Sequence, residues 1–229
     1  MIAFKKFEDY GVKALFSDKD DGDMSFENIK SREVFLKKQD IDKNIIYAKQ
    51  THSKNIKIIK NDKENYFEDI DGFITNLDNV ALFTLHADCL PIYILDKQSK
   101  VISLLHSGWK GSYQEIVKES IYLLEKNFNA KRNNLLIAIG PGIDVLNYEV
   151  QKDFEEKFRE KFDNNILKDV FIEKNNKIYF DNKKFNYNLL KNLGIKDIII
   201  SKECTYNGNY FSFRRNKDKK RNGAFLFYM

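Results

Sequence analysis

The chain is poor in several residue types that strongly constrain structure and location. Its 229 residues include only two cysteines, Cys89 and Cys204, which are too few for a disulfide framework, so we expect free thiols in a reducing compartment. No apolar run approaches the ~18 residues that a membrane helix needs. The segment Met1–Lys6 lacks the apolar stretch of a signal peptide. These absences predict a cytoplasmic protein without a membrane partner.

Basic and acidic residues are also nearly balanced, with 39 Lys and Arg against 34 Asp and Glu. The net charge is +5, with 42% hydrophobic and 32% charged residues, which fits a folded globular chain rather than a disordered one. Arginine is scarce, and three of the six arginines lie in 214–221. Because the basic segment is short, nucleic-acid binding is disfavoured. Arg214 and Arg215 are candidates for binding an anionic group such as phosphate, the alternative being a solvated basic loop.

Hydrophobic patterning predicts a mixture of strands and helices without strict alternation, which is typical of an α+β fold with mixed sheets. Val80–Leu85 is apolar throughout, as expected of a strand buried on both faces. The other expected strands are 45–48, 56–59, 72–75, 91–95, 101–105, 135–139, 178–180, 197–201 and 225–228. The expected helices are 31–40, 112–127, 148–162 and 185–192, the last ended by Gly194. Length alone is compatible with one large domain or two small ones.

The rare histidines and one cysteine lie in a single stretch of the chain. His52, His86, Cys89 and His106 all fall within residues 52–106, each next to the end of a predicted strand. Each has an ordinary explanation when taken alone: an exposed turn, a buried inert cysteine, or a strand-to-helix turn with a packed tryptophan. Strand ends are also where functional side chains commonly lie.

Taken together, these residues suggest a metal site. The long separations exclude a zinc finger, whereas two histidines and one cysteine fit a three-ligand site with an open fourth position, the pattern of catalytic zinc. We therefore predict His52, Cys89 and His106 as metal ligands. His86 competes for a ligand position but is expected on the opposite strand face. Asp88 is a candidate proton carrier or partner of a ligand.

Several short motifs, in this order, resemble the YfiH-type laccase-domain family, also called multicopper polyphenol oxidases and later purine nucleoside phosphorylases. The resemblance covers about residues 45–229. The matching segments are Gln50-Thr51-His52, Asp71-Gly72, Ala87-Asp88-Cys89-Leu90-Pro91, His106-Ser107-Gly108-Trp109-Lys110-Gly111, Ile139-Gly140-Pro141, Cys204-Thr205 and Phe211-Ser212-Phe213-Arg214-Arg215. Two departures are Ser107 and Lys110, where the family usually has alanine and arginine.

The resemblance implies a single α+β domain spanning residues 1–229, with mixed sheets and flanking helices. It places the family's His, Cys and His ligands on His52, Cys89 and His106, and implies zinc, with copper in some members. It implies phosphorolysis of adenosine, inosine, guanosine and methylthioadenosine, and deamination of adenosine as a side activity. The expected partners are therefore purine nucleosides and phosphate, bound by a monomer or weak homo-oligomer.

The same motifs indicate further residues of the expected site. We expect Arg214, Arg215 and Lys110 to neutralise phosphate, with Gln50 in the substrate site and Asp88, Cys89 and His106 as the catalytic group. The resemblance also relates Arg32 to an arginine near the family's substrate pocket, although that region is shorter here.

The ligand content of the chain disfavours a multicopper oxidase. A multicopper oxidase needs many His and Cys ligands, and three histidines with two cysteines cannot build such a centre in one chain. Nucleoside chemistry at one zinc is therefore preferred over polyphenol oxidation. Two other readings stay open: a metal-free cysteine hydrolase or amidase, which would suit the peptidoglycan editing ascribed to some relatives, and a non-catalytic metal-binding module.

Overall fold

Two six-stranded β-sheets form the centre of the molecule. The computed structural model describes all 229 residues. The first sheet has the order β1-β2-β15-β7-β3-β5, and the second has the order β14-β10-β8-β9-β6-β4. The strands of the first sheet are β1 (Ile2–Ala3), β2 (Val12–Phe16), β3 (Asn44–Lys49), β5 (Tyr66–Glu68), β7 (Val80–His86) and β15 (Asn222–Tyr228). Those of the second are β4 (Ile56–Ile59), β6 (Gly72–Thr75), β8 (Leu90–Asp96), β9 (Val101–Ser107), β10 (Leu135–Ile139) and β14 (Asp197–Ile200).

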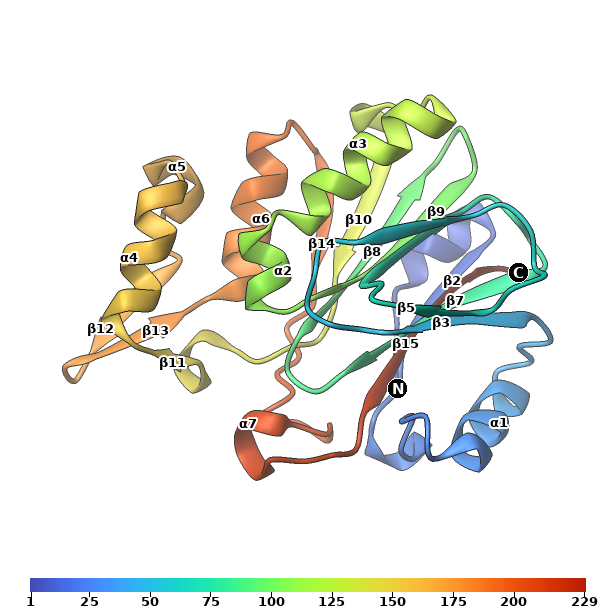
Figure 1. Cartoon of the computed structure of the whole chain (residues 1–229), viewed down its shortest axis with the longest axis horizontal. Helices are drawn as coiled ribbons and strands as arrows, with labels where there is room; N and C mark the ends of the chain where they lie inside the picture. Colours follow the sequence, from blue (N-terminus) through green and yellow to red (C-terminus); the bar gives the residue numbers. More distant parts are fainter.

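Helices cover both outer faces of this pair of sheets (Figure 1). The α-helices are α1 (Ile29–Lys38), α2 (Trp109–Tyr113), α3 (Ile116–Phe128), α4 (Lys152–Lys161), α5 (Asn164–Leu167), α6 (Asn182–Asn192) and α7 (Phe213–Asn216). Short 3-10 helices are η1 (Lys5–Tyr10), η2 (Lys19–Asp21), η3 (Arg132–Asn134) and η4 (Val145–Asn147). No helix combines the length and apolar character needed to cross a lipid bilayer.

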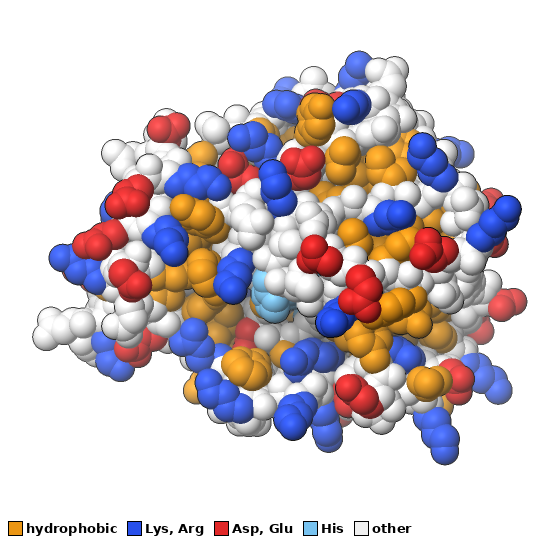
Figure 2. Space-filling view, viewed as in Figure 1, with side chains coloured by type: hydrophobic (Ala, Val, Ile, Leu, Met, Phe, Trp, Pro, Cys, Tyr) orange, Lys and Arg blue, Asp and Glu red, His pale blue; other side chains and the backbone are white.

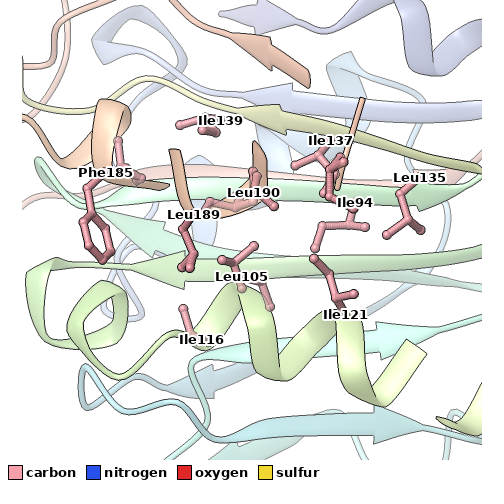
Figure 3. Close-up of a cluster of buried hydrophobic side chains, with 14 of the residues drawn as sticks. Ile94, Leu105, Ile116, Ile121, Leu135, Ile137, Ile139, Phe185, Leu189 and Leu190 are labelled. Atoms are coloured by element: carbon pink, nitrogen blue, oxygen red, sulfur yellow. The ribbon is translucent and has the colours of Figure 1, made fainter. Parts of the chain in front are cut away.

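Three apolar clusters separate the layers. A cluster of 21 buried residues fills the space between the two sheets, and one of 24 lies between the second sheet and helices α3 and α6. Figure 3 shows part of the latter, with Leu105 and Ile137 from strands facing Ile121 and Leu189 from helices. A cluster of eight packs α1 against the outer face of the first sheet. The molecule is therefore a four-layer α/β/β/α sandwich, a mixed α+β fold as predicted.

The apolar strands behave as their patterns predict. In β7, Val80 and Leu82 face the inter-sheet core, while Ala81 and Phe83 face α1. In β10, Leu136 and Ala138 face the inter-sheet core, and the alternate residues face α3 and α6. Because both faces are covered by apolar layers, an alternating polar pattern is absent from these strands.

A small sheet extends the molecule beyond α6. It has the order β11-β13-β12, from Glu149–Val150, Lys177–Phe180 and Phe171–Lys174 respectively. Helix α4 packs on it through Phe154 and Phe158, whose rings contact Phe171 and Phe180 at centroid distances of 5.0–6.3 Å. Phe158 and Phe162, which directly follows the helix, contact Phe185 of α6 at 5.2 and 4.9 Å. The predicted start of this helix at 148 is wrong, because Glu149 and Val150 pair with Tyr179 and Ile178. The helix begins at Lys152.

The helix predicted at 112–127 is also interrupted. Glu115 adopts a left-handed backbone with φ of +60°, which ends α2 and starts α3 in a new direction. The apolar stripe survives because Val117, Ile121 and Leu124 all lie on α3 and face the core. Segments 2–3, 12–16, 66–68 and 171–174, for which no strand was predicted, are strands in the structure.

Candidate metal centre and substrate cavity

The three side chains predicted as ligands converge at one end of the two sheets. One nitrogen from each of His52 and His106 and the sulfur of Cys89 all lie within 4.8 Å of one another. His52 Nε2 is 3.6 Å from Cys89 Sγ, and the two imidazole rings meet edge-on with centroids 4.8 Å apart. Residues far apart in sequence thus form one compact group of two nitrogens and one sulfur.

Local backbone geometry explains how this group forms. His106 lies in β9, Cys89 follows β7 where the chain crosses from the first sheet to the second, and His52 follows β3. Two non-glycine residues at this end, His52 and Asp88, have φ of +62° and +87°. Strained backbone of this kind persists only where surrounding contacts hold it, and it is common at functional sites.

The contact that holds His52 is the buried carboxylate of Asp71. Its oxygens accept hydrogen bonds from the backbone N–H groups of Thr51, His52 and Ser53 at 2.8–3.1 Å. The same carboxylate lies 2.8 Å from His106 Nδ1. In the sequence, Asp71 is part of the family motif Asp71-Gly72, and no role is predicted for it from the pattern alone. The signal available was an aspartate directly before a strand in the stretch that contains the histidines.

Asp71 orients the ligands electrostatically as well. Burial would raise the pKa of its carboxyl, but the hydrogen bond with His106, the charge of His106 and the Ser53 donors lower that pKa to about 2. The carboxylate is therefore ionised, and it fixes the Nδ1 proton of His106 so that Nε2 faces Cys89 and His52. A carboxylate–histidine pair of this type commonly orients and strengthens a metal ligand.

The cysteine and His106 are coupled in the absence of a metal. Burial would raise the pKa of the Cys89 thiol, but the charge of His106 and hydrogen bonds with His106 and His52 lower it to about 6. Burial opposes protonation of His106, whereas the Cys89 thiolate and the Asp71 hydrogen bond raise its pKa to about 9. The site thus contains a thiolate, which is the form that binds metal.

The donor set and its spacing fit a small transition-metal ion. Zinc–nitrogen and zinc–sulfur bonds of roughly 2.0–2.3 Å in tetrahedral geometry place ligand atoms roughly 3.3–3.6 Å apart. The separation of 3.6 Å between His52 Nε2 and Cys89 Sγ agrees with this geometry. Two imidazoles and one thiolate suit zinc and are also tolerated by copper. Three protein donors would leave one position of a tetrahedral ion open to another ligand, and all three side chains line the cavity described below.

His86 does not belong to this group. It is fully buried, with Nε2 2.8 Å from Thr84 Oγ1 and Nδ1 3.1 Å from the carbonyl oxygen of Cys89. Burial and the nearby charge of His106 hold the pKa of His86 well below its usual value. Both ring nitrogens are used in hydrogen bonds, so His86 supports the Cys89 loop from behind rather than competing as a ligand.

A cavity of about 420 Å³ opens beside the ligands. Small-molecule sites usually occupy ~300–1,000 Å³, so the space suits a ligand of nucleoside size. Its wall includes all three predicted ligands and the basic side chains Lys49, Arg214 and Arg221, with Asp88 as the one acidic residue. Figure 2 shows a histidine in a hollow on this face of the molecule, with Lys and Arg side chains around it. The cavity is therefore basic.

The structure brings Arg214 to the cavity but not Arg215. Arg214 lies over the Tyr148 ring at 5.0 Å, donates from Nη1 to the exposed Glu149 carbonyl oxygen at 3.0 Å, and lines the cavity wall. The Arg215 guanidinium instead donates to the backbone carbonyls of Tyr206, Gly208 and Tyr210 and does not line the cavity. Arg215 therefore braces the C-terminal segment, whereas Arg214 remains placed to meet a ligand.

Lys110 and Arg32 also stand outside the cavity wall. The Lys110 ammonium lies 5.7 Å from the ring of the cavity residue Trp109. The Arg32 guanidinium lies 5.7–6.0 Å from the rings of Phe26, Tyr47 and Phe83, so it is enclosed by aromatic side chains. Of these three rings, only Phe26 lines the cavity, so Arg32 is separated from the cavity by that ring.

Gln50 and Asp88 line the cavity, but their polar atoms are engaged. The Gln50 side-chain amide donates to the Leu85 carbonyl oxygen and accepts from the Leu85 N–H, which ties the segment after β3 to β7. The Asp88 carboxylate accepts from Thr205 Oγ1 and from the backbone N–H of Arg214, both at 2.7 Å. Gln50 therefore connects the cavity wall to β7, and Asp88 connects it to the segments that contain Thr205 and Arg214.

The fold and site together define a class: an α/β/β/α sandwich with a potential mononuclear His-Cys-His metal site at the base of a basic cavity. The comparison with protein families agrees with this class. The family model described as multi-copper polyphenol oxidoreductase laccase matches residues 15–228, and the chain belongs to that family.

Curated relatives and solved structures extend the comparison. The chain is 39% identical over 179 residues to a purine nucleoside phosphorylase of Borreliella burgdorferi, covering 78% of this chain and 77% of the relative. It is 34% identical to a purine nucleoside phosphorylase of Campylobacter jejuni, covering 80% and 76%. The crystal structure of the hypothetical protein YfiH from Bacillus licheniformis superposes with a TM-score of 0.91 at 22% identity, covering 100% and 96%. This last likeness shows that the fold is shared.

Proposed function

We propose that the chain is a metal-dependent purine nucleoside phosphorylase that uses zinc held by His52, Cys89 and His106. The observation that carries the proposal is the convergence of these three donors, within 4.8 Å of one another, on a cavity of nucleoside size. The names of the relatives support the reaction class. The substrates would be adenosine, inosine, guanosine and methylthioadenosine, with deamination of adenosine as a side activity.

Different residues would bind the metal, orient its ligands and bind phosphate. When bound, zinc would supply a Lewis acid facing the cavity. Asp71 holds His106 in the tautomer that presents Nε2 to the site. Arg214, with Lys49 and Arg221 on the same wall, would bind phosphate and place it against C1′ of the ribose. Fixed cationic groups of this kind stabilise charge that develops as the purine departs.

Asp88 has a different role from proton transfer in this proposal. Both of its carboxylate oxygens accept hydrogen bonds, one from the backbone N–H of Arg214. Because Asp88 precedes Cys89 directly, it ties the phosphate-binding arginine to the metal ligand. We therefore assign Asp88 a positioning role, which would set the distance between phosphate and metal. Since both oxygens are already engaged, the proposal does not use the proton-carrier role suggested by the sequence.

The test is phosphate-dependent release of base from adenosine and inosine by protein of measured metal content. Turnover that requires phosphate, stops with a chelator and returns with zinc is the expected result. Base release that persists in the metal-free protein would contradict the proposal. The single group of potential ligands also argues against a multicopper oxidase, which needs several such groups.

A second candidate function has a specific observation behind it. Cys89, His106 and Asp71 form a continuous chain of contacts that resembles the nucleophile, base and orienting carboxylate of a cysteine hydrolase. In that case the metal-free protein would cleave peptide amides, such as those of peptidoglycan, and zinc would inhibit. Amide cleavage that increases after zinc removal would favour this second function.

A further inference from the structure

Four aromatic side chains line the cavity, and three of them have other rings as partners inside the protein. Phe26 packs against Tyr47, Trp109 against Phe154 and Tyr148 against Phe180, with ring centroids 5.4, 5.2 and 5.7 Å apart. The Tyr148 ring also lies beneath the Arg214 guanidinium. These three rings are already committed to packing within the fold.

Phe213 is the exception. Its side chain is half exposed, at 50%, although it lines the cavity. It has no aromatic partner, and its one close cation is Lys217, whose ammonium lies 4.9 Å from the ring centroid. That contact covers one face of the ring and leaves the other without a ring or cation on it. An apolar ring kept in water at a cavity wall gains most from a flat ligand that covers it.

The backbone around Phe213 is held firmly. Phe213 opens α7, which Ser212 caps by accepting a hydrogen bond from the backbone N–H of Arg215. The next residue, Arg214, donates its N–H to Asp88 at 2.7 Å. Since Asp88 precedes the ligand Cys89, the backbone that carries the Phe213 ring is held at a set position relative to the metal group. A ligand that stacks on this ring therefore loses little free energy in ordering the protein.

We propose that Phe213 is the stacking platform for the purine base and that it favours purine over pyrimidine ligands. The inference rests on the proposed function for the identity of the ligand. Stacking depends on the area shared by two flat rings, and the fused purine ring system covers more of a phenyl face than a single pyrimidine ring does. Removing an aromatic partner from a stacked base typically weakens binding roughly 5- to 150-fold.

The experiment measures binding rather than turnover. Hypoxanthine and uracil are titrated calorimetrically into protein loaded with one zinc per chain, without phosphate. We expect F213A to weaken hypoxanthine binding by roughly 5- to 150-fold and to affect uracil less, whereas F213W should retain or improve it. L146A is the matched control, because Leu146 is a similarly exposed apolar side chain, at 52%, outside the cavity wall. Zinc content and thermal unfolding verify that each variant is folded.

Two outcomes overturn the inference: no measurable hypoxanthine binding by the unaltered protein, or an affinity that F213A leaves unchanged. Parallel assays of phosphorolysis keep this result separate from the proposed function. Phosphorolysis together with base binding that ignores Phe213 overturns the stacking role alone. Base binding that depends on Phe213, without phosphorolysis under any metal condition, overturns the proposed function and supports the stacking role.

Discussion

The carboxylate of Asp71 lies 2.8 Å from Nδ1 of His106 and also accepts the backbone N–H of His52. One buried side chain thus orients two of the three potential metal ligands. His106 is held through its ring, and His52 through a backbone with φ of +62° that would otherwise be unfavourable. The geometry of the site therefore depends on a residue that would not itself touch the metal.

The first prediction concerns this carboxylate. Asp71→Asn replaces an acceptor oxygen by an NH₂ group that cannot accept the crowded N–H donors, so His106 and His52 lose their orientation. We expect zinc affinity to fall about 10- to 100-fold, measured by competition with a chromophoric chelator. Asp69→Asn is the matched control, because Asp69 contacts Thr51 and Asn55 but neither histidine. Equal affinity in both variants would contradict the role of Asp71.

The second prediction separates the histidines. His106→Ala should abolish both stoichiometric zinc and phosphorolysis, because two donors rarely retain zinc. His86→Gln should keep about one zinc per chain, since His86 uses its nitrogens on Thr84 and the Cys89 carbonyl. Zinc content by atomic absorption decides the matter. Loss of zinc from a folded H86Q protein would mean that His86 is a ligand.

The third prediction concerns Gly108, which packs against two of the ligands. A Cβ at this position would lie 2.8 Å from both Cys89 Sγ and His52 Cδ2, too close for either side chain to remain in place. Gly108→Ala should therefore lower zinc affinity by about tenfold or more. Gly111→Ala is the control, because the nearest atom to its Cβ is 3.4 Å away. Matching zinc affinities for the two variants would show that the site tolerates the added methyl group.

The fourth prediction distinguishes the two neighbouring arginines. Arg214→Ala removes a cation from the cavity wall and should lower kcat/KM for phosphate by roughly 10- to 100-fold, with little effect on thermal stability. Arg215→Ala leaves the carbonyl groups of Tyr206 and Tyr210 without their guanidinium donor, while Gly208 keeps the Tyr210 N–H, and it should lower the free energy of unfolding by about 2 kcal/mol. Initial rates at varied phosphate and urea unfolding of both variants test this division. The reverse pattern would exchange the roles of the two residues.

The fifth prediction follows from the thiol pKa in the metal-free protein. Because the pKa of Cys89 is lowered to about 6, the thiolate predominates at pH 7. The rate of Cys89 alkylation by iodoacetamide should rise as the pH increases through about 6 and level off above it. An ordinary thiol has a pKa of about 8.5. Stoichiometric zinc should suppress the reaction. A C204S background leaves Cys89 as the single thiol, and a midpoint above pH 8 would contradict the lowered pKa.

Much of the fold is predictable from the sequence because its central strands have an unambiguous apolar pattern. Gly72–Thr75 and Leu135–Ile139 have the predicted bounds, and Val101–Ser107 extends the predicted strand by two residues. The strand at 12–16 was missed, since Lys13 interrupts its apolar run and tertiary pairing with β15 decides its conformation. The break at Glu115 has no local sequence signal, because a glutamate with positive φ is set by packing rather than by propensity.

The site, like the fold, is predictable from the sequence only in part. The clustering of rare histidines and a cysteine in residues 52–106, with His86 expected on the opposite strand face, selects His52, Cys89 and His106, which the structure brings together. The roles of their neighbours depend on side-chain direction. Sequence cannot show that Arg215 faces backbone carbonyls while Arg214 faces the cavity, or that Asp71 meets His106 across 35 residues. In the sequence, Phe213 is one member of a family motif, and its free ring face is visible only in three dimensions.

The order of the first sheet has a consequence for biosynthesis. Strand β15 lies between β2 and β7, although it comes after every other strand of that sheet in the chain. Asp88 likewise needs Thr205 and Arg214, which follow it by more than 100 residues. A nascent chain on the ribosome thus leaves one edge of β2 and one edge of β7 without a neighbouring strand until residues 222–228 have been synthesised. A message truncated shortly before codon 222 would yield a polypeptide with all three ligands and an open sheet, a substrate for proteases rather than an enzyme.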